Sequence, residues 1–354
     1  NVNYLTLHGT MDSDLTESFG DRQYERTRFN ESGNFKATVE LYHANHGQFN
    51  TVWGKYDEQF PGAILLNTAD LMSGDDQRLA AQIYISSFLR ASLLQEAHYE
   101  AVFQDFRTVG QYLPITGYVT RYSHSNESLL YDFEKEYGDT AWSTTAELEA
   151  EVIDLKGRSD GDKQNSGLWL QWLGEQQRIT FNLSRQQQFM LNKQIEAITI
   201  SVARTSYRQD EKASEDEEQQ FAANNEGSEH DEWVPDIDQL DATLPIELEL
   251  YSEQIGTIRL DLDSYFSLLA PAENDFTKSS LLEGRIKKGK YDVTVEPLLQ
   301  TYIIPVSLLG TEAQAMSLAE LQQITLHFKQ IVGSLIVDNI GVITEGGTHV
   351  QYNR

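Results

Sequence analysis

Apolar and polar positions change their spacing along this chain. In the first hundred residues, apolar runs at 3–8 and 35–42 alternate with stretches at 15–29 and 75–95 that are spaced for helices. Asp75 or Asp76 can cap the second helix, and one of its faces collects apolar residues: Leu79, Ile83, Tyr84 and Phe88. Strand, helix, strand, helix predicts a parallel sheet with helices on its faces.

From about residue 119 the period becomes two. Apolar residues alternate with polar ones in five segments: 179–183, 198–202, 246–250, 258–262 and 324–328. Strands of this kind keep one face in a core and one in water, and several of them with little helix predict a β-sandwich of the jelly-roll type. We therefore predict two domains, 1–118 and 119–354, the second carrying a mobile acidic loop at 208–238.

Composition narrows the classes of function. The 354 residues carry a formal net charge of -28, which repels nucleic acid and anionic membranes. No apolar run is long enough to span a bilayer. The chain has no cysteine, which excludes disulfides, thiolate metal sites and a cysteine nucleophile. It opens into an apolar strand without a signal peptide, so we expect a processed or truncated chain.

Two candidate catalytic residues follow the first two predicted strands. Asp12 comes after a strand and a glycine turn, and His46 lies in the loop after residues 35–42. Functional groups of parallel sheets gather beyond the carboxyl ends of the strands. A carboxylate held there can orient an imidazole, which in turn accepts a proton near neutral pH. We predict Asp12 and His46 as the catalytic acid and base.

Other assignments of these residues stay open. Asp14 competes with Asp12, and His43 competes with His46. Asp12 could instead cap the following helix, with His46 an ordinary loop histidine. The four side chains together could also imitate a zinc cluster, although zinc sites usually need three ligands with supporting partners.

The order of these motifs carries a resemblance to a known family. His8-Gly9-x-x-Asp12, followed by a helix, a strand and Asn45-His46-Gly47-x-Phe49, resembles the last two strands of the α/β-hydrolase fold. It is closest to secreted bacterial esterases and lipases near the platelet-activating-factor acetylhydrolases and polyester hydrolases. The resemblance spans about the first 110 residues. It implies the C-terminal half of a hydrolase sheet, an ester substrate, a Ser-His-Asp triad and a secreted or periplasmic bacterial protein.

The nucleophile departs from that pattern. A Gly-x-Ser-x-Gly match at 157–161 follows the acid and the histidine, and it lies among charged residues, so we interpret Ser159 as part of a solvated loop. The resemblance then places the serine on a missing N-terminal part, outside this chain. The first expectation is thus a serine ester hydrolase that needs no cofactor.

The second domain supports an alternative, a non-catalytic carbohydrate- or surface-binding module. The run Gly333-Ser-Leu-Ile-Val-Asp338-Asn-Ile resembles the last strand of galactose-binding-like and carbohydrate-binding jelly rolls. This resemblance suggests a polysaccharide or surface ligand. Trp169 and Trp172 should point to opposite faces of one strand, as core residues or as a sugar platform. A structural calcium ion is a further candidate, with ligands unassigned and Asp338 expected to be structural.

Overall fold

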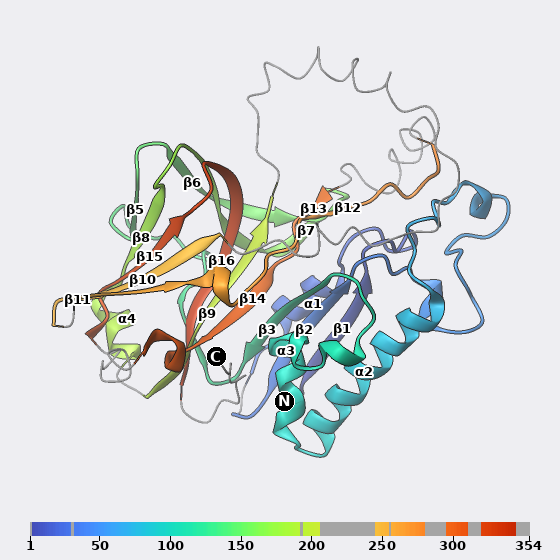
Figure 1. Ribbon diagram of the computed structural model, residues 1–354, viewed down its shortest axis with the longest axis horizontal. Helices are drawn as coiled ribbons and strands as arrows, with labels where there is room; N and C mark the ends of the chain where they lie inside the picture. The colour runs from blue at the N-terminus through green and yellow to red at the C-terminus, as the bar shows by residue number, and fades with distance from the viewer. Residues whose placement is uncertain are drawn as a thin grey trace, which may run out of the picture.

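The computed structural model describes residues 2–29, 32–191, 194–205, 245–254, 256–279, 295–310 and 320–344. The expected acidic loop at 208–238 and Trp233 lie outside these ranges. Within them the chain forms a small N-terminal αβ unit and a β-sandwich that lie side by side (Figure 1).

The αβ unit is built on a three-stranded sheet in the order β1-β2-β3. Strands β1 (Tyr4–Gly9) and β2 (Phe35–Leu41) are parallel, and β3 (Tyr118–His124) is antiparallel to β2. The described residues therefore show one parallel pair, and they do not show half of an α/β-hydrolase sheet. Strand β3 straddles the expected boundary at residue 118, and the division of the chain into two domains there remains a proposal.

Helices and short turns surround this sheet. The helices are α1 (Gly20–Arg26), α2 (Gly74–Leu93) and α3 (Ala101–Gln104). Turns of 3-10 helix are η1 (Gly47–Phe49), η2 (Gly62–Leu65), η3 (Ala97–Glu100), η4 (Phe106–Thr108) and η5 (Gly110–Tyr112). Within the described ranges, no helix is both long enough and apolar enough to cross a membrane.

The sandwich contains two antiparallel sheets. The five-stranded sheet has the order β11 (Gly256–Asp261), β10 (Ile246–Ser252), β15 (Gln323–Phe328), β8 (Arg178–Asn182) and β5 (Trp142–Thr144). The larger sheet has the order β14 (Gln300–Pro305), β9 (Ile195–Arg204), β16 (Val332–Thr344), β7 (Asp162–Leu173) and β6 (Leu148–Lys156), with β4 (Glu127–Tyr131) also on β16. Smaller elements are β12 (Ala272–Glu273), β13 (Val295–Glu296), α4 (Arg185–Met190), η6 (Leu262–Ser264) and η7 (Val306–Leu309).

The predicted β-sandwich is confirmed. Every second residue of β10 (Ile246, Leu248 and Leu250) is buried, and Ile324 and Leu326 of β15 join it in the same core. The alternation of apolar and polar residues predicts these strands correctly because each of them has one face on the core between the sheets and one face outside.

The helix expected at 15–29 is shorter, running from Gly20 to Arg26. The carboxylate of Asp12 accepts hydrogen bonds from the backbone N–H groups of Asp14 (3.0 Å) and Leu15 (2.7 Å), which holds this part of the chain in a turn. The carbonyl of Thr16 then accepts a hydrogen bond from Arg158 of the sandwich at 2.9 Å. The residues before Gly20 therefore bond to other parts of the molecule instead of to a helix.

Helix α2 lies where the spacing predicts it, and Tyr84, Ile83 and Phe88 of the predicted face are buried or pack against the core, whereas Leu79 points outward. Ser73 is its N-cap and accepts a hydrogen bond from Asp76 N, so neither predicted aspartate is the cap. Leu79 is 42% exposed, and the buried positions are Gln77, Ala80, Ala81, Tyr84 and Ser87. Small side chains on this face let the helix approach the sheet closely.

The αβ unit covers the outer face of the larger sheet. Ala197, Ile303 and Ile343 of the sandwich share a core with the residues of β2 and β3. The backbone N–H of Tyr122 on β3 donates to the hydroxyl of Thr301 on β14 at 3.1 Å. The five-stranded sheet lies on the opposite side of the sandwich core.

Candidate functional site

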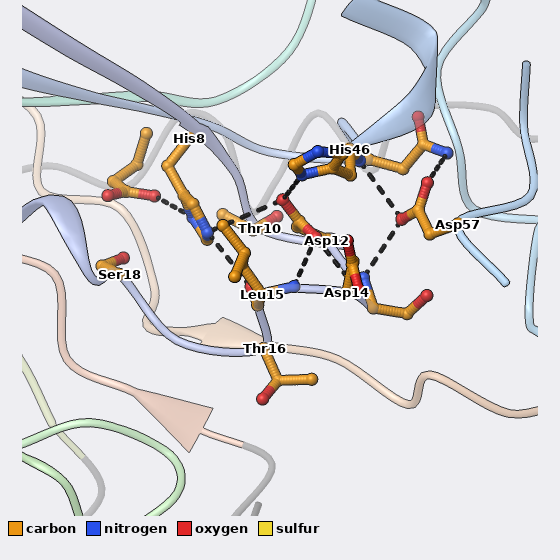
Figure 2. A network of polar contacts seen from close by, with 12 residues as sticks. His8, Thr10, Asp12, Asp14, Leu15, Thr16, Ser18, His46 and Asp57 are labelled. Carbon is orange, nitrogen blue, oxygen red and sulfur yellow. Dashed lines mark hydrogen bonds and ion pairs between the residues drawn. The ribbon is translucent and has the colours of Figure 1, made fainter. Parts of the chain in front are cut away.

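The loops after β1 and β2 bring Asp12 and His46 together. Nδ1 of His46 lies 2.8 Å from Oδ2 of Asp12, a hydrogen-bond distance, and Figure 2 shows the two side chains facing each other. A carboxylate accepts but does not donate, so the proton lies on Nδ1 and Nε2 of the neutral ring is left as an acceptor. The sequence analysis placed both residues at this edge of the sheet.

Asp12 is held rigidly and is 2% exposed. Its other carboxylate oxygen accepts the backbone N–H groups of residues 14 and 15, as described above. The oxygen that faces His46, Oδ2, also lies 3.9 Å from Nε2 of His8 (Figure 2). Both oxygens of Asp12 are therefore held, one by backbone N–H groups and one between two imidazoles.

His8, the first residue of the His8-Gly9-x-x-Asp12 motif, is a further member of this group, for which the motif predicted no role. Its Nδ1 lies 3.0 Å from the carboxylate of Glu40 on β2. Burial alone would lower the pKa of His8, but the charges of Glu40, Asp12 and Glu296 outweigh burial and raise the pKa to about 9. His8 is therefore a cation at neutral pH. Its signal in the sequence was its place in that motif, near the end of β1 and four residues before Asp12.

The imidazole of His46 reaches solvent. Its side chain is 33% exposed, and its ring stacks on that of Trp53 with centroids 5.7 Å apart and planes 8° apart. Among the described residues, none forms a hydrogen bond with Nε2 of this ring. The free nitrogen is thus open to a molecule that approaches past Trp53, which is 64% exposed.

Asp57 organises the loop that carries His46. Its carboxylate accepts the backbone N–H groups of Ser13 (3.1 Å), His46 (3.2 Å) and Gly47 (2.8 Å), and the side-chain amide of Asn45 (2.7 Å). Burial is the main reason that the pKa of Asp57 is raised, although these donors oppose it. Asp57 lies in an irregular segment, where no sequence pattern identifies it.

The rival residues point elsewhere. The side chain of His43 bonds through Nδ1 to the carbonyl of Asp70 at 3.0 Å, and burial lowers its pKa. Asp14 is exposed and meets Asp12 only through its own backbone N–H. In the described part of the chain, no three His, Asp or Glu side chains are grouped to hold a metal ion. The predicted zinc cluster is therefore not assembled among those residues. A calcium site, which backbone and amide oxygens can also build, stays a prediction.

The Gly-x-Ser-x-Gly match forms the turn between β6 and β7. Ser159 bonds through its hydroxyl to Glu17, and Arg158 is 1% exposed. Arg158 donates to the carbonyls of Thr16 and Ala272, at 2.9 and 3.0 Å. The turn therefore docks the sandwich onto the αβ unit, so the interpretation of Ser159 as part of a solvated loop is wrong for its neighbours Gly157 and Arg158, which are buried.

The outward face of the five-stranded sheet presents a second group of polar side chains. Three cross-strand rows run over β10, β15 and β8: Tyr251–Gln323–Asn182, Glu249–Thr325–Thr180 and Glu247–His327–Arg178. Within the rows, Gln323 donates to Asn182 at 2.9 Å, and the hydroxyls of Thr180 and Thr325 lie 2.9 Å apart. The side chains alternate with the core residues of the same strands, so the core fixes their direction.

Charged groups border these rows. His327 lies 3.0 Å from Glu249, and Arg259 of β11 reaches Glu249 at 2.7 Å and Glu247 at 3.1 Å. The result is an ordered polar surface with one tyrosine, over four neighbouring strands. Sequence alternation gave the direction of each side chain, but it could not show which strands are neighbours.

Trp169 and Trp172, which the sequence leaves open as core residues or as a sugar platform, are core residues. Trp169 and Trp172 do point to opposite faces of β7, yet they are only 5% and 2% exposed. Trp172 stacks on Phe328 in the main core, with centroids 4.2 Å apart. Trp142 belongs to β5 and packs against the same core. Asp338 is buried against Arg121, as expected of a structural residue.

Comparison with known proteins found solved structures that are similar to part of this chain. No family model and no curated protein matches the chain. One similar structure is the family 11 carbohydrate-binding module from Clostridium thermocellum in complex with a β-1,3-1,4-mixed-linked tetrasaccharide (TM-score 0.31, 13% identity, 62% of this chain and 95% of that one). Another is the CBM22-1 xylan-binding domain from Paenibacillus barcinonensis (TM-score 0.27, 11% identity, 62% and 97%). A third is an exo-β-agarase (TM-score 0.29, 10% identity, 61% and 25%).

The fold corrects the expected class of protein. The described residues form mainly a β-sandwich, and they show one parallel pair of strands, β1 and β2, where half of a hydrolase sheet was expected. The expectation of an esterase or lipase-like α/β hydrolase with a catalytic triad is wrong, and the β-sandwich is what remains. The TM-scores are too low for these likenesses to argue for a ligand of this chain.

Proposed function

We propose that this protein binds carbohydrate on the outward face of the five-stranded sheet. What supports the proposal is the row Tyr251–Gln323–Asn182 and the two polar rows beside it. Sugars present ring hydroxyls to amides, carboxylates and guanidinium groups, and they lay their apolar C–H faces on aromatic rings. One face of this sheet carries all of these groups.

The position of this face supports the same proposal. The opposite sheet is covered by the αβ unit through Ala197, Ile303 and Ile343. The five-stranded sheet has its apolar side chains inside and its polar ones outside, without a covering layer in the described part of the chain. An extended polymer can lie across such a surface, whereas it could not enter a closed cavity.

Affinity electrophoresis in gels that contain soluble neutral polysaccharides tests the proposal. Substituting Tyr251→Ala removes the aromatic ring of the face, and Gln323→Ala removes the amide between Tyr251 and Asn182. Each variant should lose about tenfold in affinity, which corresponds to about 1.4 kcal/mol. The matched control is Tyr112→Ala, since this tyrosine is 64% exposed and belongs to the αβ unit.

The outcomes separate clearly. Binding that is weakened by Tyr251→Ala and Gln323→Ala, but not by Tyr112→Ala, supports the face as the site. Equal retardation of all four proteins would place any binding elsewhere. If the wild-type protein binds none of a panel of glucans, xylans and galactans, carbohydrate binding is overturned.

A second proposal concerns Asp12 and His46. We propose that they form a proton-transfer pair, in which Asp12 fixes the tautomer of His46 and Nε2 accepts a proton. The 2.8 Å contact, the burial of Asp12 and the exposure of His46 support this role. The pair alone does not define a substrate.

Nitrogen-15 NMR of the histidine rings tests this pair. In the wild-type protein, neutral His46 should be the Nδ1–H tautomer, and Asp12→Asn should give a mixture because an amide can donate as well as accept. Carbethoxylation of His46 should also slow by about tenfold, since a hydrogen bond to a charged group contributes about 1.5–3 kcal/mol. His98, which stacks on Tyr99, is the internal control. An unchanged tautomer in Asp12→Asn would overturn the proposal.

We also propose that the protein acts outside the cell. Structural polysaccharides are met there, and a net charge of -28 keeps a protein soluble in a salty medium. Recovery of the native protein in the cytosolic fraction alone would contradict this.

A further inference from the structure

A pocket of about 600 Å³ opens at one edge of the sandwich. On one side it is lined by Leu130 and Tyr131 of β4, which belongs to the larger sheet. On the other side it is lined by Asn182 of β8, in the five-stranded sheet, and helix α4 contributes Gln186. Its volume falls within the range of roughly 300–1,000 Å³ that is usual for small-molecule sites.

The floor of this pocket is rigid and aromatic. The rings of Tyr131 and Tyr137 are 5.1 Å apart, and Tyr137 lies 5.8 Å from Trp142. The hydroxyl of Tyr131 lies 2.6 Å from the carbonyl of Asn182 and 3.0 Å from that of Ala141, so it ties the two sheets together beneath the opening. The pocket is therefore built into the core of the sandwich.

The chemistry of the walls suits a polyhydroxylated, uncharged ligand. Amides, hydroxyls and tyrosine rings line the pocket together with a few aliphatic side chains, and among the described lining residues the cation is Lys135. No carboxylate is among the described lining residues, although the chain carries 55 acidic residues. Lys135 lies 3.4 Å from Asp132, so its charge is partly balanced. An anionic ligand would also be repelled by the net charge of the protein.

The pocket is continuous with the polar face of the five-stranded sheet. Asn182 lines the pocket and also ends the row Tyr251–Gln323–Asn182, where its Oδ1 accepts from Gln323. A saccharide chain that lies along this row from Tyr251 reaches the opening of the pocket at Asn182.

We propose that this pocket receives the end of a neutral saccharide chain whose following units lie on the sheet face. This inference rests on the proposed carbohydrate function and deepens it: the face holds the interior of the chain, and the pocket recognises its terminus. Short oligosaccharides then depend on the pocket more strongly than long polymers, which retain their contacts with the face.

Gly138 offers a way to close the pocket without disturbing the fold. It lines the pocket, and a Cβ built on it would meet no atom within 4 Å. Gly138→Trp should therefore fill the opening. Gly110→Trp is a matched control, because Gly110 also has free space at its Cβ and, like Gly138, its carbonyl accepts a turn bond from the residue three positions on.

The experiment is calorimetric titration with gluco-, xylo- and laminari-oligosaccharides of two to six units, and with the parent polymers. The proteins are the wild type, Gly138→Trp, Gly110→Trp and Tyr251→Ala, each checked for an unchanged melting temperature. We expect Gly138→Trp to bind di- and trisaccharides at least tenfold more weakly and the polymers less than threefold more weakly. Tyr251→Ala should weaken both, and Gly110→Trp should weaken neither.

Other outcomes decide against one proposal or the other. If Gly138→Trp binds every ligand like the wild type while Tyr251→Ala does not, the pocket does not bind the end of the saccharide, and binding on the sheet face is supported. If Gly138→Trp loses the short ligands while Tyr251→Ala keeps all of them, the face is overturned as the path of the chain. If the wild-type protein binds no ligand of the series, the carbohydrate function and the pocket fall together.

Discussion

At the scale of single residues, the loop that carries His46 depends on one carboxylate. Asp57 accepts four donors, three of them backbone N–H groups. A Cβ on Gly47 would lie 2.4 Å from the carbonyl oxygen of Gly54, so the loop packs against itself tightly at this point. The backbone that carries His46 is therefore held by residues that do not touch its ring, while Asp12 and Trp53 contact the ring itself.

Substituting Asp57→Ala tests this dependence. The change leaves four partly buried donors without their acceptor, and each such loss costs about 1–3 kcal/mol where water does not replace it. We expect faster hydrogen exchange at the amides of Ser13, His46 and Gly47, and a lower melting temperature. Asp75→Ala is the control, because the side chain of Asp75 is 97% exposed. Unchanged exchange at the three amides would show that Asp57 does not hold the loop.

At the scale of elements, the sequence predicts what depends on local periodicity. The strands at β1, β2, β8, β9, β10, β11 and β15 and the helix α2 follow from spacing alone. Local spacing does not predict the turn before α1. This turn depends on the hydrogen bonds that the Asp12 carboxylate accepts from the backbone, and on Arg158 of the sandwich, which is 142 residues from its acceptor Thr16. The rows on the sheet face likewise depend on strand neighbours that no local pattern specifies.

The candidate residues divide in the same way. Asp12 and His46 could be predicted because the ends of two strands next to each other in the sequence also lie together in the sheet. His8 could have been found from the motif that contains it, because it lies near the end of β1, four residues before Asp12. Asp57 could not be found, since its role rests on backbone donors from two separate loops.

Helix α2 allows a direct comparison of the predicted and observed faces. The sequence places Leu79 inward, whereas the structure places Ala80 inward with no exposed surface. Ala80→Leu should lower the free energy of unfolding by about 1–3 kcal/mol, since a larger side chain does not fit a packed core. Leu79→Ala should change it by less than about 0.5 kcal/mol, as is usual for surface positions. Chemical denaturation of both variants measures this, and the reverse order would contradict the observed face.

At the scale of the whole molecule, buried charges join the two units. Lys163 of β7 lies 2.7 Å from Glu296 and 3.1 Å from Asp21 of α1, and all three side chains are at most 13% exposed. Arg121 of β3 contacts Asp338 of β16 and Glu25, and it is 2% exposed. Removing one member of such a network leaves its partner charged and buried, which is strongly destabilising. The αβ unit and the sandwich are therefore expected to unfold together.

His8 connects this network to the Asp12–His46 pair, because Glu40, Asp12 and Glu296 all act on its charge. With a folded pKa of about 9 and an unfolded value near 6.5, the native state binds this proton more tightly than the unfolded chain does. Its contribution to stability is complete below pH of about 6.5 and is lost as the pH rises through about 9. The loss amounts to about 1.4 kcal/mol per pH unit at most within that window.

Unfolding by urea at pH 6.5 and at pH 8.5, for the wild type and for His8→Gln, isolates this contribution. The wild type should lose stability relative to the variant over this interval, because the variant has no proton to lose at position 8. Lys36, whose pKa burial lowers to about 8, is present in both proteins and cancels in the comparison. If His8→Gln does not fold, NMR titration of His8 in the wild type gives the same answer. A midpoint near 9 supports a charged His8 between the two units, and a midpoint at or below 6.5 would show that its carboxylate neighbours do not hold the proton.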